Sequence, residues 1–257
     1  MQTLNTPIFE TVPVLGIPLA VTDYARAVAL TLAWTQEPRV RAVAAANTHV
    51  ITLGRHDREF GTALAQFDMI VPDGMPLIWA MNRRGAALSD RVYGPTLMLH
   101  ALAQPGVSHF LLGGSEQLLE RLTARLQERF PGIHLAGSYS PPFGEWPEGE
   151  DARIFQKIAA SGAQYIWVGL GCPKQERWIA RNKAALPPGV YFAIGAAFAF
   201  HAGMVSQAPA WMQKRGLEWL YRFAAEPRRL WKRYVVYNTL FLWYLTTEML
   251  FTSKRNP

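Results

Sequence analysis

Cysteine is nearly absent from this chain, and the short motifs that mark several common kinds of site are missing. The single cysteine, Cys172, excludes an intrachain disulfide and metal sites built on paired cysteines. No Asp-x-Asp occurs among the aspartates, and the histidines show no metal-ligand spacing, so we expect no bound metal. No Gly-x-Gly-x-x-Gly opens a helix, which weakens a nicotinamide dehydrogenase, and no Gly-x-Ser-x-Gly marks an α/β-hydrolase. The sequence therefore favours a site without a resident metal or cofactor.

Targeting and membrane-spanning signals are also missing. The first sixteen residues lack both a basic segment and an uninterrupted apolar run, so they do not resemble a secretory signal. Polar side chains interrupt the most apolar stretch, residues 235–251, whereas a spanning helix needs roughly 20 predominantly apolar residues. We therefore expect a cytoplasmic protein whose C-terminal helix lies at an interface and does not cross a membrane.

Apolar runs and helix-like segments alternate from about residue 12 to residue 200. RVRAVAAAN, DMIVP, SHFLLGG and QYIWVGLG each precede a helical pattern, and VYFAIGAAFAF follows the last of these helices. The runs are continuously apolar, as in strands that are buried on both faces of a sheet. This order predicts an α/β fold with a doubly wound, mainly parallel, Rossmann-like sheet and helices on both faces.

The charge and aromatic content change near residue 208. Residues 211–257 hold nine Lys and Arg against three Glu, whereas residues 1–210 are nearly neutral with seventeen against sixteen acids. We divide the chain into an α/β domain (residues 1–207) and a basic, aromatic, helical C-terminal appendage (residues 208–257). Tryptophan and tyrosine favour interfaces, and basic residues favour anionic headgroups, so the appendage suits an anionic membrane surface. A helix pair packed on the domain with a solvated basic edge is the alternative, and charge alone also permits nucleic acid.

Ligands in open α/β sheets bind beyond the carboxyl ends of the strands, so the residues that follow each apolar run are the first candidates. Asn47 in AAANTH suits a sugar or nucleotide contact, or equally the N-cap of the next helix. Gly113, Gly114 and Ser115 lie between a strand and a helix, where a phosphate can approach the backbone. Tight turns need glycine for conformational reasons alone, so both interpretations stay open.

Two further strand ends carry polar groups. In VGLGCPKQERW, Pro173 suits the first turn of a helix, which does not explain Gln175 beside Lys174, so we favour a functional role there. Cys172 lacks a neighbouring base in the sequence and is interpreted as a small residue in a tight turn.

Asp73 follows the run DMIVP and is either a turn-forming cap or a general base in a partly desolvated cleft. Arg91, eighteen residues further on, is a candidate cation to pair with that carboxylate, or its guanidinium can bind a diphosphate with two hydrogen bonds. The spacing does not show that the two side chains meet.

Together these motifs resemble the WecG/TagA/CpsF glycosyltransferases, glycosyltransferase family 26. The resemblance runs in order through ANTHVI, DMIVPDGMPLIWA, RVYGPTLM, FLLGGSEQ, VGLGCPKQERW, IGAAFAFHAGMVSQAPAWM and GLEWLYRFAAEPRRLWKR, from about residue 40 to 235. Each motif is modest, and the set is specific. The resemblance implies metal-independent transfer, with inversion, of a sugar from a UDP-sugar to a polyprenyl-diphosphate-linked saccharide. It places the enzyme peripherally on the cytoplasmic face of the inner membrane.

The resemblance also assigns roles by position. It makes Asp73 the catalytic base, Asn47 and Gln175 active-site polar groups, and Arg91 a contact for the donor or acceptor. Gly113, Gly114, Ser115, Gly171 and Lys174 would help to hold the donor and its diphosphate. The cations expected to meet the lipid diphosphate or headgroups are Arg222, Arg228, Arg229, Lys232 and Arg233. Some members have a threonine where this chain has Ala45, a difference that can reflect another sugar.

The sequence leaves the donor sugar, the oligomeric state and two rival functions open. The donor sugar is an N-acetylmannosamine, its uronic acid or a hexose such as glucose, and a homo-oligomer is compatible with the sequence. A nucleotide-dependent oxidoreductase or epimerase would use the same kind of sheet. A basic nucleic-acid or membrane-binding module would need no Asp73, but only the appendage is basic, so we expect no nucleic acid.

Overall fold

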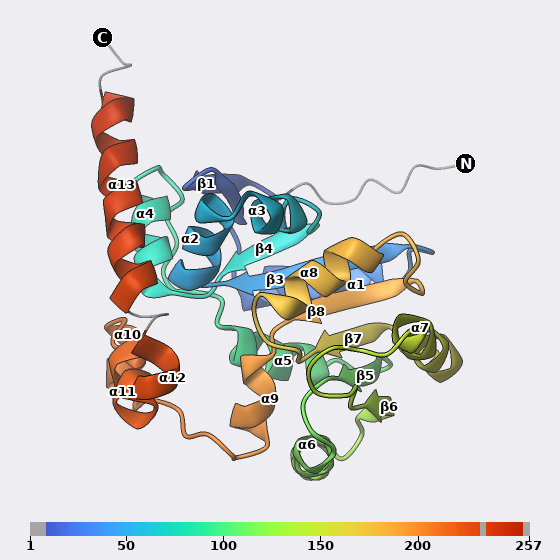
Figure 1. Cartoon of the computed structure of the whole chain (residues 1–257). Coiled ribbons are helices and arrows are strands. Elements are labelled where there is room, and N and C mark those ends of the chain that lie inside the picture. Colours follow the sequence, from blue (N-terminus) through green and yellow to red (C-terminus); the bar gives the residue numbers. More distant parts are fainter. Residues whose placement is uncertain (1–8, 232–234, 254–257) are drawn as a thin grey trace.

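The computed structural model describes residues 9–231 and 235–253 and is built around a six-stranded, all-parallel sheet (Figure 1). The strands in spatial order are β4 (Met69–Pro72), β3 (Val40–Ala46), β8 (Gly189–Ala193), β7 (Tyr165–Val168), β5 (Ser108–Leu112) and β6 (His134–Tyr139). Strands β4, β5, β7 and β8 are buried at every position, which explains their unbroken apolar sequences. The predicted α/β fold with a parallel sheet is confirmed.

Helices cover both faces of the sheet and divide the core into two clusters of buried side chains. One cluster includes residues from α2 (Thr48–His56), α3 (Arg58–Leu64), α4 (Met75–Asn82), α7 (Glu150–Ser161) and α8 (Lys174–Asn182). The other includes residues from α1 (Tyr24–Trp34), α5 (Gly94–Leu102), α6 (Glu116–Arg129) and α9 (Ala196–His201). The layers on either side of the sheet can be followed in Figure 1.

Several local details differ from the sequence-based expectations. The sequence predicts one helical segment over residues 48–67, which follows RVRAVAAAN. The structure has two helices there, because the Asp57 carboxylate accepts a hydrogen bond from Phe60 N–H and starts α3. The run VYFAIGAAFAF is divided between two elements: strand β8 ends at Ala193, and helix α9 begins at Ala196. An antiparallel hairpin, β1 (Thr11–Val14) and β2 (Ile17–Ala20), precedes the sheet, and its apolar residues join the core.

The appendage forms α10 (Ala210–Lys214), α11 (Glu218–Ala225), α12 (Pro227–Trp231) and α13 (Tyr237–Ser253). The sequence predicts that Pro227 opens the last helix; Pro227 instead begins the short helix α12, and the last helix, α13, begins at Tyr237. Helix α13 stands along one side of the α/β domain next to α2 and α4, and α10 to α12 lie at its lower end (Figure 1). None of the described helices is both long enough and apolar enough to cross a membrane.

Candidate active site

Asn47 and Asp73 leave adjacent strands at the same level of the sheet. Ala46 of β3 pairs with Pro72 of β4, and Asp73 N–H donates to the Ala46 carbonyl at 2.8 Å. The next strands in spatial order, β8 and β7, end with Ala193 paired to Val168. The polar residues after four neighbouring strands therefore meet at one edge of the sheet, as expected for a parallel sheet.

The carboxyl group of Asp73 is buried, and one of its oxygens has no hydrogen-bond partner among the described residues. That oxygen is Oδ1, which is enclosed by the protein. Burial raises the pKa of Asp73 to about 7, against the opposing effect of the Arg91 charge and with a further raising contribution from Glu218. The N–H of Gly94 and the more distant Arg222 also favour the charged form. A carboxylate with this pKa is half ionised near neutral pH and is suited to accept a proton.

Asn47 caps a helix and also faces the same space as Asp73. Its Oδ1 accepts from the N–H groups of His49 and Val50, at 3.1 and 3.3 Å, which confirms the N-cap alternative. Because Oδ1 is occupied in this way, the Asn47 amide is held in a fixed orientation. The side chain lines both cavities described below, so the cap and a ligand contact are compatible.

The larger cavity at this edge has a volume of about 770 Å³. The loops after β7 and β8, the start of α2, and the appendage residues Arg222, Glu226, Leu230 and Tyr237 enclose it. Asp73 and Gly171 are among its lining residues. Its volume falls in the range of about 300–1,000 Å³ that is usual for small-molecule sites.

Gln175 fixes the distance between two loops that line this cavity. The side chain is buried, and its Oε1 accepts from Gly171 N–H and Gly195 N–H, each at 3.1 Å. Its Nε2 donates to Glu176 Oε1 at 2.9 Å. A Cβ on Gly195 would lie 2.5 Å from Gln175 Oε1, so glycine is needed there for this close approach. Gln175 therefore shapes the cavity, and its predicted catalytic role stays a prediction.

A smaller cavity of about 290 Å³ adjoins the larger one, between α2, α4, α11 and α13. Its wall is partly apolar, with Met75, Pro76, Trp219, Phe241 and Leu242. Arg91, Tyr93, Glu218 and Arg222 supply its polar part. The two cavities share a few residues besides Asn47 and Asp73, and Arg222 is one of them.

Comparison with known proteins decides the class of this site. The family model described as "Glycosyl transferase WecG/TagA/CpsF family" matches residues 12–255, which extends beyond the span of the motifs. This chain belongs to the WecG/TagA/CpsF family. It is therefore a glycosyltransferase, and the oxidoreductase and binding-module alternatives are not needed.

Curated relatives of this WecG/TagA/CpsF protein come from Staphylococcus aureus strains NCTC 8325 / PS 47 and COL. Each is named N-acetylglucosaminyldiphosphoundecaprenol N-acetyl-beta-D-mannosaminyltransferase. Each is 29% identical over 194 residues, which cover 74% of this chain and 73% of the relative.

The structure of this WecG/TagA/CpsF protein does not bring four predicted donor contacts into either cavity. They are Gly113, Gly114, Ser115 and Lys174. Ser115 caps α6 by accepting from Leu118 N–H, and Lys174, the first residue of α8, donates to the Gly144 carbonyl. Gly113 has a φ of 109°, and a Cβ there would lie 2.7 Å from the Gly169 backbone, so its glycine is required by packing. Their role in donor binding stays a prediction.

Arg91 lies in the smaller cavity and is paired with the appendage. Its Nη2 donates to Glu218 Oε2 at 2.7 Å, and its guanidinium lies 4.3 Å from the centroid of the Tyr93 ring. Sequence reasoning did not select Glu218, because it lies 127 positions from Arg91, and it did not select Tyr93 either, although Tyr93 is only two residues from Arg91. Glutamate in the first turn of a helix has an ordinary explanation in the helix dipole.

His49 is a second residue that the sequence did not single out. Its Nδ1 lies 3.9 Å from Cys172 Sγ, and its ring meets that of Tyr237 edge-on at 4.6 Å between centroids. All three residues line the larger cavity. Ala45, where some family members have threonine, also lines it, so the loss of a hydroxyl there changes the cavity wall.

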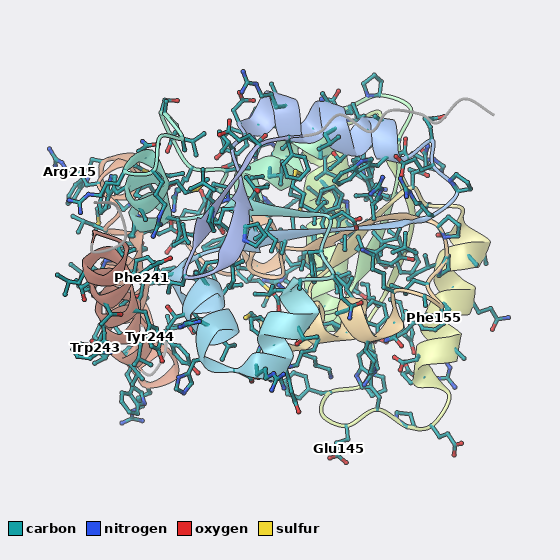
Figure 2. The ribbon with its side chains drawn as sticks, turned by 90° about the horizontal axis from the view of Figure 1, so that it is seen from above. Glu145, Phe155, Arg215, Phe241, Trp243 and Tyr244 are labelled. Carbon is teal, nitrogen blue, oxygen red and sulfur yellow. The ribbon has the colours of Figure 1, made fainter. Side chains whose placement is uncertain are left out.

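The appendage packs against the α/β domain through α13. Thr48 donates to Asn238 at 2.9 Å, His56 lies 3.0 Å from the Tyr244 hydroxyl, and Arg84 pairs with Glu248 at 3.0 Å. Figure 2 shows Phe241 on the side of α13 toward the domain and Trp243 on its outer side. This arrangement matches the packed-helix alternative, but the outer side of α13 is apolar, because residues 237–253 include no Lys or Arg and Leu242, Trp243 and Leu250 are exposed.

Large apolar side chains are exposed along the appendage. They are Trp211, Trp219, Leu220, Trp231, Val235, Leu242, Trp243 and Leu250. Of the cations predicted to meet lipid, Arg222 lines both cavities and Arg228 is exposed. Lys232 and Arg233, with the side chain of Arg229, lie outside the described part of the chain.

Proposed function

We propose that this protein transfers a sugar from a UDP-sugar to a polyprenyl-diphosphate-linked saccharide, with inversion at the anomeric carbon and without a metal ion. The sugar is N-acetylmannosamine, its uronic acid or a hexose such as glucose, and the product is used in cell-surface polysaccharide or teichoic acid synthesis. The names of the Staphylococcus aureus relatives support a lipid-diphosphate acceptor that carries N-acetylglucosamine.

The observation that carries this proposal is the position of Asp73. Asp73 lines both cavities, its Oδ1 is buried and unpaired among the described residues, and its pKa of about 7 suits proton transfer near neutral pH. A base that must serve a reaction between two substrates is expected where both binding spaces meet.

In the proposed reaction, Asp73 takes the proton of an acceptor hydroxyl while that oxygen attacks the anomeric carbon. The bond between the anomeric carbon and the diphosphate oxygen breaks, and UDP leaves with the electron pair. General-base assistance of this kind typically contributes about 10²- to 10⁴-fold to the rate. Arg222, which lines both cavities, is the described cation best placed to meet the charge of a diphosphate.

We assign the donor to the larger cavity and the acceptor to the smaller one. The larger cavity has the volume that a nucleotide sugar requires, and its lining includes the polar side chains of Asn47, Asp73 and Arg222. The smaller cavity has an apolar side formed by Met75, Trp219 and Leu242, which suits the start of a polyprenyl chain. Each substrate would then reach Asp73 from a different side.

We also propose that the enzyme acts peripherally on the cytoplasmic face of the inner membrane. The exposed tryptophans of the appendage and the exposed Arg228 offer apolar and cationic contacts to an anionic bilayer surface. The lipid-linked acceptor would be present at that surface.

The reaction is tested with the purified full chain, a soluble polyprenyl-diphosphate N-acetylglucosamine analogue and a panel of UDP-sugars, each without and with a chelator. Mass spectrometry identifies the product, and NMR gives its anomeric configuration. We expect transfer from one donor with inversion, and a rate that the chelator leaves unchanged. Absence of transfer from every donor, or retention of configuration, would contradict the proposal.

Asp73→Asn tests the base. We expect kcat to fall about 10²- to 10⁴-fold, because the amide cannot take the proton. Asp151→Asn is the matched control, since Asp151 pairs with Arg181 in a partly exposed position outside both cavities, and we expect its rate within about two-fold of wild type. An Asp73→Asn variant with unchanged kcat would remove Asp73 from this role.

A further inference from the structure

Both carboxylate oxygens of Glu218 are bound by residues of the α/β domain. Oε2 accepts from Arg91 Nη2 at 2.7 Å, and Oε1 accepts from the Tyr93 hydroxyl at 2.8 Å. Glu218 is 8% exposed, Arg91 9% and Tyr93 6%, so this cluster is closed to solvent. Loss of one partner from a buried ion pair leaves an uncompensated charge, which is strongly unfavourable. The appendage is therefore fastened to the domain at this point.

The cluster of Glu218, Arg91 and Tyr93 lies near the proposed base. Val92 N–H donates to the Pro72 carbonyl at 2.9 Å, which holds the segment containing Arg91 against the end of β4, directly before Asp73. Glu218 and Arg222 are four residues apart on α11, and residues at this spacing share one helix face. Fixing Glu218 therefore also fixes the turn that carries Arg222 into the cavities around Asp73.

The Arg91 side chain donates hydrogen bonds to residues of the appendage. Its Nη2 donates to Glu218 and, at 3.5 Å, to Gln213 Oε1, both in the appendage. Its guanidinium is stacked on Tyr93 at 4.3 Å, which further restricts its movement. A guanidinium held in this way is committed to the protein and is poorly placed to grip a donor diphosphate.

We propose that Glu218 is a positioning residue, which binds Arg91 and Tyr93 and so holds α11 with Arg222 facing Asp73. Arg91 serves this attachment and does not bind the donor diphosphate. The kinetic consequence of this inference rests on the proposed function, whereas the attachment itself does not. A correct placement of Arg222 matters mainly in the transition state, so its loss lowers kcat more than it raises the donor KM.

The test compares Glu218→Gln, Arg91→Gln and the double variant in the full chain. Glu248→Gln is the matched control, because Glu248 also joins the appendage to the domain, through Arg84, but is about one-third exposed. Hydrogen exchange of α11 and the kinetic constants for the donor are measured for each. Tyr93→Phe removes only the second hydrogen bond to Glu218 and keeps the ring beneath Arg91.

We expect Glu218→Gln and Arg91→Gln each to speed exchange in α11 and to lower kcat at least about tenfold, with the donor KM within about twofold. When kcat is compared at a pH at which Asp73 is ionised in every variant, the opposite effects of Arg91 and Glu218 on the Asp73 pKa do not enter. The double variant should then be no worse than either single one, because both remove the same interaction. Tyr93→Phe should show a smaller change of the same kind, and Glu248→Gln should keep wild-type kcat and α11 exchange.

Three results would overturn the inference. One is a donor KM raised tenfold or more by Arg91→Gln but not by Glu218→Gln, which would make Arg91 a donor contact. Another is additive losses in the double variant. The last is faster α11 exchange in Glu218→Gln with unchanged kcat, which would make the pair structural only. Absence of transfer by the wild-type protein would instead refute the proposed function, and the exchange data would still decide whether Glu218 holds α11.

Discussion

Asn47 and Asp73 lie side by side because the residues that precede them, Ala46 and Pro72, are paired in the parallel sheet. The amide of Asn47 is oriented by its cap contacts, and Asp73 N–H is held by the Ala46 carbonyl at 2.8 Å. The relative position of the two side chains is therefore set by the rigid part of the fold. The predictions below depend on this geometry and on the helices that close over it.

The rate of transfer should depend on pH through Asp73. With a pKa of about 7, the carboxyl is protonated and inactive as a base at lower pH, so kcat/KM should fall below about pH 7. Arg222 favours the charged form, so Arg222→Gln should move this fall to higher pH in addition to lowering the rate. The measurement is kcat/KM from pH 5 to 9. A fall centred near pH 4 would show that Asp73 has an ordinary pKa.

Asp73 should also make the fold less stable as the pH rises. The folded-state pKa of about 7 lies above the ordinary aspartate pKa of 3.8, so the folded protein keeps a proton that the unfolded chain loses between these values. Its contribution to the free energy of unfolding is therefore favourable below about pH 4 and is lost as the pH passes 7. Asp73→Asn should gain stability relative to wild type across this interval, on the order of 1–3 kcal/mol by denaturant titration. An equal difference at pH 4 and pH 8 would contradict this.

Gln175 should matter for both stability and rate. Gln175→Leu keeps the size of the side chain but leaves the N–H groups of Gly171 and Gly195 without their acceptor. We expect the free energy of unfolding to fall by about 1–3 kcal/mol and kcat to fall with it, because the loops that line the larger cavity separate. Gln127→Leu, at an exposed position of α6, is the control and should change stability by less than about 0.5 kcal/mol. Equal effects of the two variants would show that the Gln175 contacts are unimportant.

Substitution of two aromatic residues of α13 should distinguish packing on the α/β domain from binding to a membrane surface. Phe241 is 2% exposed and packs on the domain, whereas Trp243 is 64% exposed on the outer side (Figure 2). Phe241→Ala should lower the stability by about 3–5 kcal/mol, or release α13 alone if that helix unfolds separately. Trp243→Ala should leave stability within about 0.5 kcal/mol and weaken binding to anionic vesicles. The measurements are thermal unfolding and vesicle sedimentation, and unchanged sedimentation of Trp243→Ala would count against a role of this face in membrane binding.

The sequence predicted the sheet, most of its helices and the edge where the site lies, because these follow from local patterns. Continuous apolar runs identified the strands, and the polar residues after them, Asn47, Asp73 and Gln175, do converge. The contact between Arg91 and Glu218 was not predictable, because it joins positions 127 residues apart through a packing of helices that no local pattern specifies. The glycines Gly113 and Gly114 were ambiguous for a different reason, since turn geometry and phosphate binding require the same residue type.

Side chains from α11 to α13 form part of the wall around Asp73. The strands and helices that carry Asp73, Asn47 and Gln175 are all complete by His201, before this wall begins. During synthesis on the ribosome, the α/β domain therefore emerges first, with its buried carboxylate still open on one side. The site is finished only when the last fifth of the chain has been made and has folded back onto α2 and the segment that contains Arg91.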